Sequence, residues 1–228
     1  MKELKSKKMS SHHIVRDDQE PALIIANGAP CNDELLGQLL EWSPLVIVLD
    51  SAMERVLDLG IKVDVLLGDF DRDFDAEFYR QTQYPIEIVH TPDQNKTDLE
   101  KAFDYLIERK IPAVNVVWAT GKRADHTISN ITNIIRYRNL LKIVILDDHS
   151  KIFLLPKKFE KWYPADTILS LIPIGTVQGI QSKNLFYPLQ NDTLTIGYRT
   201  GSSNHVNEDG LVCIEHQSGD LLLMECFD

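Results

Sequence analysis

The chain has 228 residues and a formal net charge of −10, from 24 Lys and Arg against 34 Asp and Glu. Hydrophobic residues make up 43% and charged residues 25%, the balance of a globular protein with a full core. No run approaches the ~18–20 apolar residues that a membrane span needs. The acidic charge argues against nucleic-acid binding, which depends on Lys and Arg, so we expect neither a membrane nor a nucleic acid as partner. It does not exclude a nucleotide enzyme, because metal ions can supply positive charge locally.

The first 20 residues are polar, with four lysines but no apolar block behind them. A secretory signal needs such a block, so residues 1–20 are predicted to be a short flexible leader on a cytoplasmic protein. The three cysteines, Cys31, Cys213 and Cys226, form no CxxC pair and no metal-ligand spacing. We expect them to be reduced thiols.

Residues 21–150 alternate between short apolar runs and segments of helical length. The predicted strands are 22–26, 45–49, 63–67, 86–89, 114–118 and 143–146. The predicted helices are 32–41, 52–59, 75–83, 98–109 and 126–138. Several strands are continuous apolar runs, as expected for strands that are covered on both faces. The pattern therefore predicts an α/β domain with a largely parallel sheet.

After residue 150 the helical pattern stops. Short apolar segments at 152–155, 167–172, 193–196, 211–215 and 221–224 are separated by Gly, Pro, Asn and Asp. This spacing predicts a smaller all-β domain over 151–228, built as a sandwich or a partial jelly roll.

Polar residues follow the predicted strands, where ligands bind in open α/β sheets. Asn27 follows the first strand, Asp50 the second, and Asp69 and Asp71 the third. Asp69 and Asp71 are two residues apart, so in extended chain they project to the same side and repel each other. A bound Mg²⁺ would remove that repulsion, while a solvated Asp-rich turn explains the same residues equally well.

The fourth strand runs into a second polar segment, residues 93–101. Thr97 and Glu100 have the spacing of a capping box, which predicts that a helix begins here. A helix N-terminus binds phosphate, and Lys96 and Lys101 add positive charge. Asp98 in the first turn favours a role as a partner of the helix dipole, with metal binding as the alternative.

The fifth strand ends in a turn at Gly121 with two cations, Lys122 and Arg123, before a helix that is predicted to start at Asp125. One face of that helix is predicted to bury Ile128, Ile131, Ile134 and Ile135. Another face carries His126, Ser129, Asn130 and Asn133. This polar stripe is either the solvent side of the helix or a face turned to a ligand. The chain contains neither a G-x-x-x-x-G-K-[ST] loop nor a G-x-G-x-x-G after the first strand.

These segments, in this order, resemble the thiamine pyrophosphokinase family. The family's Gly-Asp-Phe-Asp-Ser, Asp-Gln-x-x-Thr-Asp and Gly-x-Arg-x-Asp-His elements are similar to residues 68–72, 93–98 and 121–126. Its Ser-Asn pair is similar to Ser129-Asn130, and its Gly-x-x-x-Ser-x-Ser-Asn element is similar to 197–204. The resemblance spans the chain from residue 22 to about the C-terminus. The chain departs from the family's pattern at residues 51–53, at Arg72 and at Gly201.

The resemblance implies an enzyme that converts ATP and thiamine to thiamine diphosphate and AMP with Mg²⁺, as a homodimer with thiamine bound between domains. It implies that Asp69, Asp71 and Asp98 bind the metal and act in catalysis together with Arg123. The predicted ATP-binding residues are Asn27, Asp50, Gln94, Thr97, Lys101, Arg123, Asp125, His126, Ser129 and Asn130. The predicted thiamine-binding residues are Ser202, Ser203 and Asn204, with Tyr198, Phe186 and Trp162 as candidates for stacking on the cationic ring.

The residues alone support only Mg²⁺-dependent phosphoryl or pyrophosphoryl transfer, and attack at the β-phosphorus comes from the resemblance. One alternative is a kinase or pyrophosphokinase that acts on another small alcohol. A second is a non-catalytic nucleotide-binding sensor of the same fold. The presence of every matched carboxylate weighs against the sensor.

Overall fold

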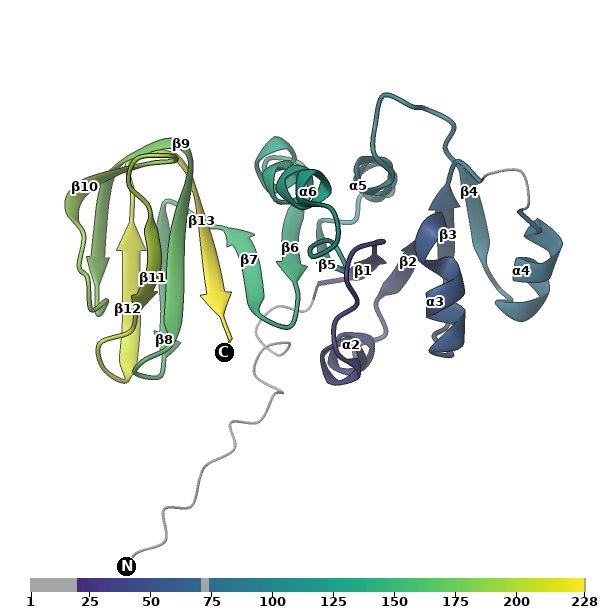
Figure 1. The fold of residues 1–228 in the computed structure, drawn as a ribbon, viewed down its shortest axis with the longest axis horizontal. Coiled ribbons are helices and arrows are strands. Elements are labelled where there is room, and N and C mark those ends of the chain that lie inside the picture. The colour runs from purple at the N-terminus through teal and green to yellow at the C-terminus, as the bar shows by residue number, and fades with distance from the viewer. Residues whose placement is uncertain (1–19, 71–73, 228) are drawn as a thin grey trace, which may run out of the picture.

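The structure is a computed structural model that describes residues 20–70 and 74–227 (Figure 1). Its first half contains six parallel strands in the spatial order β4-β3-β2-β1-β5-β6. They are β1 (Ala22–Ile25), β2 (Leu45–Leu49), β3 (Val65–Gly68), β4 (Glu87–His90), β5 (Ala113–Val117) and β6 (Lys142–Leu146). The predicted parallel sheet is confirmed.

Helices cover both faces of this sheet. They are α2 (Asp33–Leu40), α3 (Met53–Asp58), α4 (Ala76–Thr82), α5 (Asp98–Glu108) and α6 (Ala124–Arg136), with a 3₁₀ turn η1 (Asp50–Ala52) before α3. Alternate residues of β1 enter opposite cores: Ile24 packs with residues of α5 and α6, and Leu23 packs with residues of α2 and α3. In Figure 1, α5 and α6 lie above the sheet and α2 lies below it. The continuous apolar strands therefore follow from burial on both sides.

The predicted elements of this half are all present, with ends displaced by at most two residues. Two details were wrong. The last helix begins at Ala124, so Asp125 lies within its first turn and does not precede it. Ile128, which was predicted to be buried, is 64% exposed. No helix of the described residues is long and apolar enough to cross a membrane.

The second half is an antiparallel β region. Its strands are β7 (Ser150–Leu154), β8 (Lys158–Tyr163), β9 (Ile168–Lys183), β10 (Gln190–Thr195), β11 (Gly201–His205), β12 (Gly210–Glu215) and β13 (Ser218–Cys226). Strand β7 pairs with β6 on one side and β13 on the other, so hydrogen bonds continue from the parallel strands into this region. Neither β8 nor β11 was among the predicted strands: β11 has no apolar side chain, and β8 has charged residues at half of its positions.

Strand β9 connects two layers of the β region. Its first part pairs with β11 and β13, and its second part pairs with β10 and β12. Leu171 from the first part and Val177 from the second belong to one buried core, together with Leu194 of β10 and Ile214 of β12. The all-β fold class is therefore confirmed, with a core closed between two layers as in a sandwich.

One buried histidine makes the stability of the β region depend on pH. His216 is 5% exposed, and its Nδ1 lies 3.3 Å from the ammonium of Lys157. Burial, and then the Lys157 charge, lower the pKa of His216. The unfolded chain therefore binds a proton more tightly than the folded protein, and stability is lost as the pH falls from about 6.5 through the lowered pKa.

We predict that His216→Phe weakens this pH dependence. The free energy of unfolding of the unsubstituted protein, from urea titrations, should fall between pH 7.5 and pH 5 by more than that of the variant. His149→Phe is the control, because His149 is exposed, and it should behave as the unsubstituted protein does. An equal pH dependence in all three proteins would contradict the prediction.

Candidate functional site

A cleft opens in the part of the sheet where the strand order reverses, between β1 and β5. The chain passes from β1 outward through β2, β3 and β4, then returns to add β5 and β6 on the other side of β1. The segments after β1 and β5 therefore diverge at this point, where ligands bind in open α/β sheets. The cleft measures about 390 Å³. It is lined by Ala26, Asn27, Gly28, Leu49, Ser51, Asp69, Gln94, Lys96, Thr97, Asp98, Leu99, Lys101, Ala119, Thr120, Lys122, Arg123, His126, Thr127 and Asn130.

A half-buried ion pair occupies the N-terminus of α5. The Lys101 ammonium lies 3.0 Å from Oδ1 of Asp98, and the two side chains are 6% and 31% exposed. Burial raises the pKa of Asp98, the hydrogen bond from Lys101 lowers it, and the carboxylates of Asp50 and Asp69 raise it. Asp98 is therefore a more basic carboxylate than one in water.

Two further carboxylates stand near Asp98. Gln94 donates a hydrogen bond of 3.0 Å from Nε2 to Oδ2 of Asp69, which is the first cause of the lowered pKa of that carboxyl. Asp50 accepts hydrogen bonds from the backbone and hydroxyl of Ser51 and from the backbone of Phe70. Asp69 stays ionised to lower pH than usual, while Asp98 holds its proton more tightly.

The described residues contain no group of three or more His, Cys, Asp and Glu side chains placed to hold a metal ion. Asp71 lies outside the described residues. Mg²⁺ is commonly bound by one or two carboxylates together with water and substrate phosphates. Asp69 and Asp98 fit that donor set, because each is an oxygen ligand and the charge of Asp69 acts on Asp98.

Two cations, Lys122 and Arg123, also line the cleft, together with His126. Lys122, Arg123 and His126 come from the turn after β5 and the start of α6. Arg123 forms an exposed ion pair with Asp125, which lowers the pKa of Asp125 to about 2. Asn130, one turn further along α6, donates a 2.8 Å hydrogen bond to the carbonyl of Ala119 and so joins α6 to the segment after β5.

The structure brings most of the predicted site residues into this one cleft. Those that line it are Asn27, Asp69, Gln94, Thr97, Asp98, Lys101, Arg123, His126 and Asn130. Asp50 and Asp125 stand beside lining residues, Ser51 and Arg123, to which they are hydrogen bonded. Ser129 directly precedes Asn130 on α6 but does not line the cleft.

Three lining residues with hydroxyl side chains were missed: Ser51, Thr120 and Thr127. All three have small hydroxyl side chains, which are common throughout the chain and carry no distinctive spacing. Position gave a usable signal for Ser51 and Thr120, because they come two and three residues after the ends of β2 and β5.

Comparison with known proteins agrees with this arrangement. The thiamin pyrophosphokinase catalytic domain matches residues 36–145, and the thiamin pyrophosphokinase vitamin B1 binding domain matches residues 156–221. Together the two matches cover more than three quarters of the chain. The chain belongs to the thiamine pyrophosphokinase family.

Individual members of the family are similar over most of their length. Thiamine pyrophosphokinase of Bacillus subtilis (strain 168) is 28% identical over 194 residues, which are 80% of this chain and 88% of the relative. Thiamine pyrophosphokinase 1 of Oryza sativa subsp. japonica is 32% identical over 164 residues, 65% of this chain and 61% of the relative.

Solved structures of the family share the fold. The crystal structure of the Bacillus subtilis enzyme superposes with a TM-score of 0.76 at 25% identity, covering 91% of this chain and 99% of that one. Yeast thiamin pyrophosphokinase superposes with a TM-score of 0.78 at 16% identity, covering 92% and 87%. The second similarity concerns the fold alone.

The predicted thiamine-binding residues lie on β11, in the β region, and do not line the cleft. Asn204 is buried: its Oδ1 accepts from the backbone of Tyr187 and its Nδ2 donates to the Tyr187 carbonyl. Ser203 donates its backbone N–H to Ser170, while Ser202 is exposed. The amide of Asn204 thus fixes the segment that carries Phe186 and Tyr187.

Next to β11 stands an exposed group of aromatic rings. Phe186 stacks on His205 with centroids 4.5 Å apart, and Tyr187 meets Phe186 edge to face. Phe186 and Tyr187 are 51% and 62% exposed. Of the other two stacking candidates, Tyr198 is 93% exposed and Trp162 is 56% exposed.

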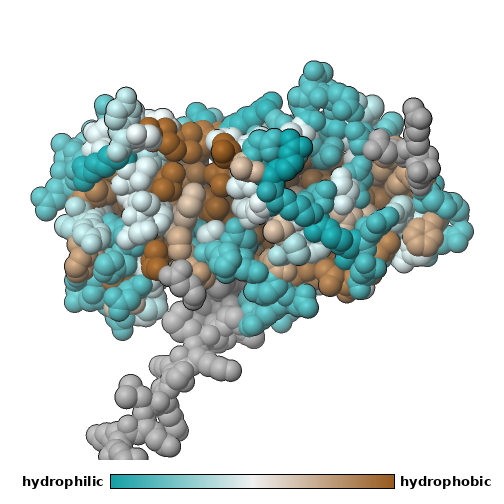
Figure 2. Space-filling model, viewed as in Figure 1, coloured by the Kyte–Doolittle hydropathy of each residue, from teal (hydrophilic) through white to brown (hydrophobic). Residues whose placement is uncertain are grey.

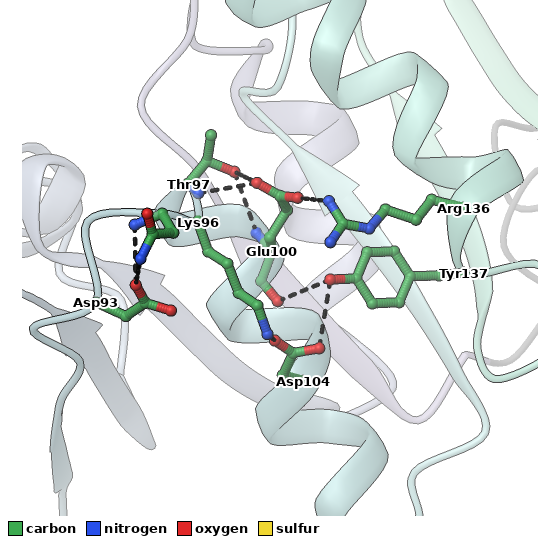
Figure 3. A network of polar contacts seen from close by, with 8 residues as sticks. Asp93, Lys96, Thr97, Glu100, Asp104, Arg136 and Tyr137 are labelled. Atoms are coloured by element: carbon green, nitrogen blue, oxygen red, sulfur yellow. Dashed lines mark hydrogen bonds and ion pairs between the residues drawn. The ribbon is translucent and has the colours of Figure 1, made fainter.

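A network of polar contacts holds the start of α5 against the end of α6 (Figure 3). Glu100, 7% exposed, accepts hydrogen bonds from the backbone and hydroxyl of Thr97 and an ion pair from Arg136. Asp104 accepts from Lys96 at 2.7 Å and from the hydroxyl of Tyr137 at 3.3 Å. The predicted capping box is confirmed, and its carboxylate also links two helices.

We predict that Glu100→Gln lowers the free energy of unfolding by about 1–3 kcal/mol, because a buried carboxylate that accepts charged and backbone donors is replaced by a neutral amide. Urea titrations give the value. Glu77→Gln is the matched control, since Glu77 lies in the first turn of α4, is exposed and accepts one hydrogen bond from Gln81. Its stability should change by less than about 0.5 kcal/mol. Equal effects at both positions would contradict the role of Glu100.

Proposed function

We propose that this chain is a Mg²⁺-dependent thiamine pyrophosphokinase, which transfers the β,γ-diphosphate of ATP to the hydroxyl of thiamine and releases AMP. The observation that carries the proposal is the convergence of Asp69 and Asp98 with Lys101, Lys122 and Arg123 in one cleft, in a chain of this family. In it, residues 21–150 bind ATP and residues 151–228 contribute to thiamine binding.

The cleft is suited to a triphosphate. The start of α5, where the N–H groups of Asp98 and Leu99 precede the capped N–H of Glu100, and the ammonium of Lys101 offer donors, and Lys122, Arg123 and His126 line the same cleft. Transfer of a phosphoryl group depends chiefly on positioning and on neutralising charge, and this cleft supplies both. Lys101 is held in place by Asp98, so little of its flexibility remains to be lost when the ligand binds.

Asp69, Asp71 and Asp98 are the proposed metal ligands. Mg²⁺ bound there would neutralise the oxygens of the transferred diphosphate and help to align them. The support from the described residues is the donor set of Asp69 and Asp98 together with the effect of the Asp69 charge on Asp98.

The proposed step is an in-line displacement. The hydroxyethyl oxygen of thiamine forms a bond to the β-phosphorus while the bond from that phosphorus to the oxygen shared with the α-phosphate breaks, and AMP leaves with that oxygen. The hydroxyl proton passes to a carboxylate, for which Asp71 and Asp98 are the candidates. The raised pKa of Asp98 makes it a better acceptor than an exposed aspartate.

Replacing Asp98 tests the cleft. Purified protein with ATP, Mg²⁺ and thiamine should form AMP and thiamine diphosphate in equal amounts. Asp98→Asn should reduce kcat/KM by about 100-fold or more, because it removes a charge that acts on the transition state. Asp58→Asn, at an exposed position at the end of α3, is the control and should keep full activity.

The products decide between this reading and its alternatives. ADP in place of AMP would overturn pyrophosphoryl transfer. Turnover with another small alcohol but not with thiamine would point to a different kinase. Nucleotide binding without any turnover would favour a sensor. Near-normal activity of Asp98→Asn would remove Asp98 from the site.

A homodimer is part of the proposal, because the β11 residues do not line the cleft of their own chain. Figure 2 shows hydrophobic residues gathered on one face between β9 and α6, and Ile172, Ile174 and Met224 are only partly buried. A second copy that covers this face would bury them. A cytoplasmic location, without nucleic-acid or membrane partners, is also proposed from the composition.

We predict that the protein sediments as a dimer at micromolar concentration with thiamine present. Ile174→Glu, which places a charge on the partly buried face, should shift the sedimentation coefficient toward that of a monomer. Leu59→Glu is the control, because Leu59 is 45% exposed at the end of α3. A monomer in every case would refute the homodimer.

A further inference from the structure

Arg55, on α3, stands behind the segment that follows β1. Its Nη1 donates a 3.2 Å hydrogen bond to the carbonyl of Gly28, and its Nη2 donates a 2.6 Å hydrogen bond to Oδ1 of Asn27. Asn27 and Gly28 line the cleft, whereas Arg55 does not. One guanidinium therefore fixes both a backbone group and a side chain of the cleft wall.

The same guanidinium joins this wall to the other side of the reversal in strand order. It lies 4.6 Å from the centroid of the Trp118 ring, and Trp118 directly follows β5. Trp118 is 1% exposed and has a positive φ of 56°, a conformation that side-chain-bearing residues adopt rarely. Contact with a buried ring and two acceptors leaves the guanidinium little freedom.

The two segments are also joined through their backbones. Gly28 donates its N–H to the Trp118 carbonyl, and Ala29 donates its N–H to the Thr120 carbonyl at 2.8 Å. A Cβ at Gly28 would collide with both carbonyls, so the close approach requires glycine. Arg55 therefore adds a side-chain link between the segments after β1 and β5, which are already joined through their backbones, so a shift of one segment moves the other.

The contacts of Asn27 also set the orientation of its amide. Its Oδ1 accepts from Arg55 and, at 3.4 Å, from the ammonium of Lys122. With the oxygen turned toward two cations, the NH₂ group is the remaining polar part of this side chain. An NH₂ group only donates hydrogen bonds, so it suits the oxygens of a phosphate or a ribose.

We propose that Arg55 is a positioning residue for nucleotide binding: it holds Asn27 and Gly28 in the arrangement that receives ATP, without touching ATP itself. This inference rests on the proposed function for the identity of the ligand. It assigns to α3 a role in the site, whereas the sequence pointed only to strand ends and to α5 and α6.

Binding of α,β-methylene ATP, in which the bond to be broken is replaced, tests the proposal by calorimetry. Arg55→Met should raise the Kd about tenfold, since it removes two charged hydrogen bonds that hold the wall. Arg55→Lys should stay weakened, because one ammonium cannot reproduce the fork over the ring. In the enzyme assay, KM for ATP should rise by a similar factor, while kcat at saturating ATP and KM for thiamine change by less than about twofold.

Arg109→Met is the matched control. Arg109 also lies over an aromatic ring, 4.7 Å from the centroid of Tyr105, and also bonds a neighbour, Glu87, but at the far end of α5. It should leave the Kd unchanged. A purely structural role for Arg55 predicts lower stability with an unchanged Kd in the protein that remains folded, and that result would overturn the proposal.

A double substitution tests the route through Asn27. If Arg55 acts in part by holding Asn27, Arg55→Met should raise the Kd by a smaller factor in Asn27→Ala than in the unsubstituted protein. Additive losses would show that Arg55 does not act through Asn27. An unsubstituted protein that binds the analogue without turning over thiamine would refute the proposed function and leave this inference standing. Unchanged binding of the analogue by Arg55→Met would refute this inference and leave the proposed function standing.

Discussion

The reversal of strand order between β1 and β5 is the constraint on which the site depends. Parallel strands end at a common edge, and at this reversal the chain leaves β1 and β5 in opposite directions, so their segments cannot fill the space between them. Backbone hydrogen bonds from Gly28 to Trp118 and from Ala29 to Thr120 join the two segments beside the opening. The helices that follow β4 and β5 bring their N-termini to the same opening, which makes it suited to an anion.

Charge in the cleft is balanced within a chain that is strongly acidic overall. The net charge is −10, yet Lys96, Lys101, Lys122 and Arg123 are gathered at one opening. Lys96 and Lys101 each form an ion pair with an aspartate on α5, Asp104 and Asp98. These two aspartates lie at different distances along the helix from the cleft. Asp104 lies along the helix and bonds Tyr137, whereas Asp98 lies at the cleft and interacts with Asp50 and Asp69. Binding of a metal cation would relieve the repulsion among these three carboxylates.

Much of the first half could be read from the sequence, because its strands are buried on both faces and its helices have strong apolar faces. The capping box at Thr97 and Glu100 located the start of α5 to the residue. The sequence could not reveal that Glu100 also binds Arg136, since that contact depends on how α5 and α6 pack. The same limit applies to Arg55, whose partners Asn27, Gly28 and Trp118 lie in the segments that follow β1 and β5. The prediction that Ile128 is buried was wrong because helical spacing grouped it with apolar neighbours, although the packing of α6 leaves it exposed.

In the β region, local sequence was a weaker guide because polar strands there are held by their neighbours. Strand β11 has little apolar character, yet pairing with β9 and the burial of Asn204 fix it in place. The carboxamide of Asn204 is engaged on both its oxygen and its nitrogen by Tyr187 and His205. An amide used in this way has little capacity left for a ligand, and its effect on a substrate would pass through the aromatic rings that it holds. A residue of a family motif can therefore act by fixing the shape of a segment as well as by direct contact. Here Asn204 is buried and holds the segment whose exposed rings are Phe186 and Tyr187.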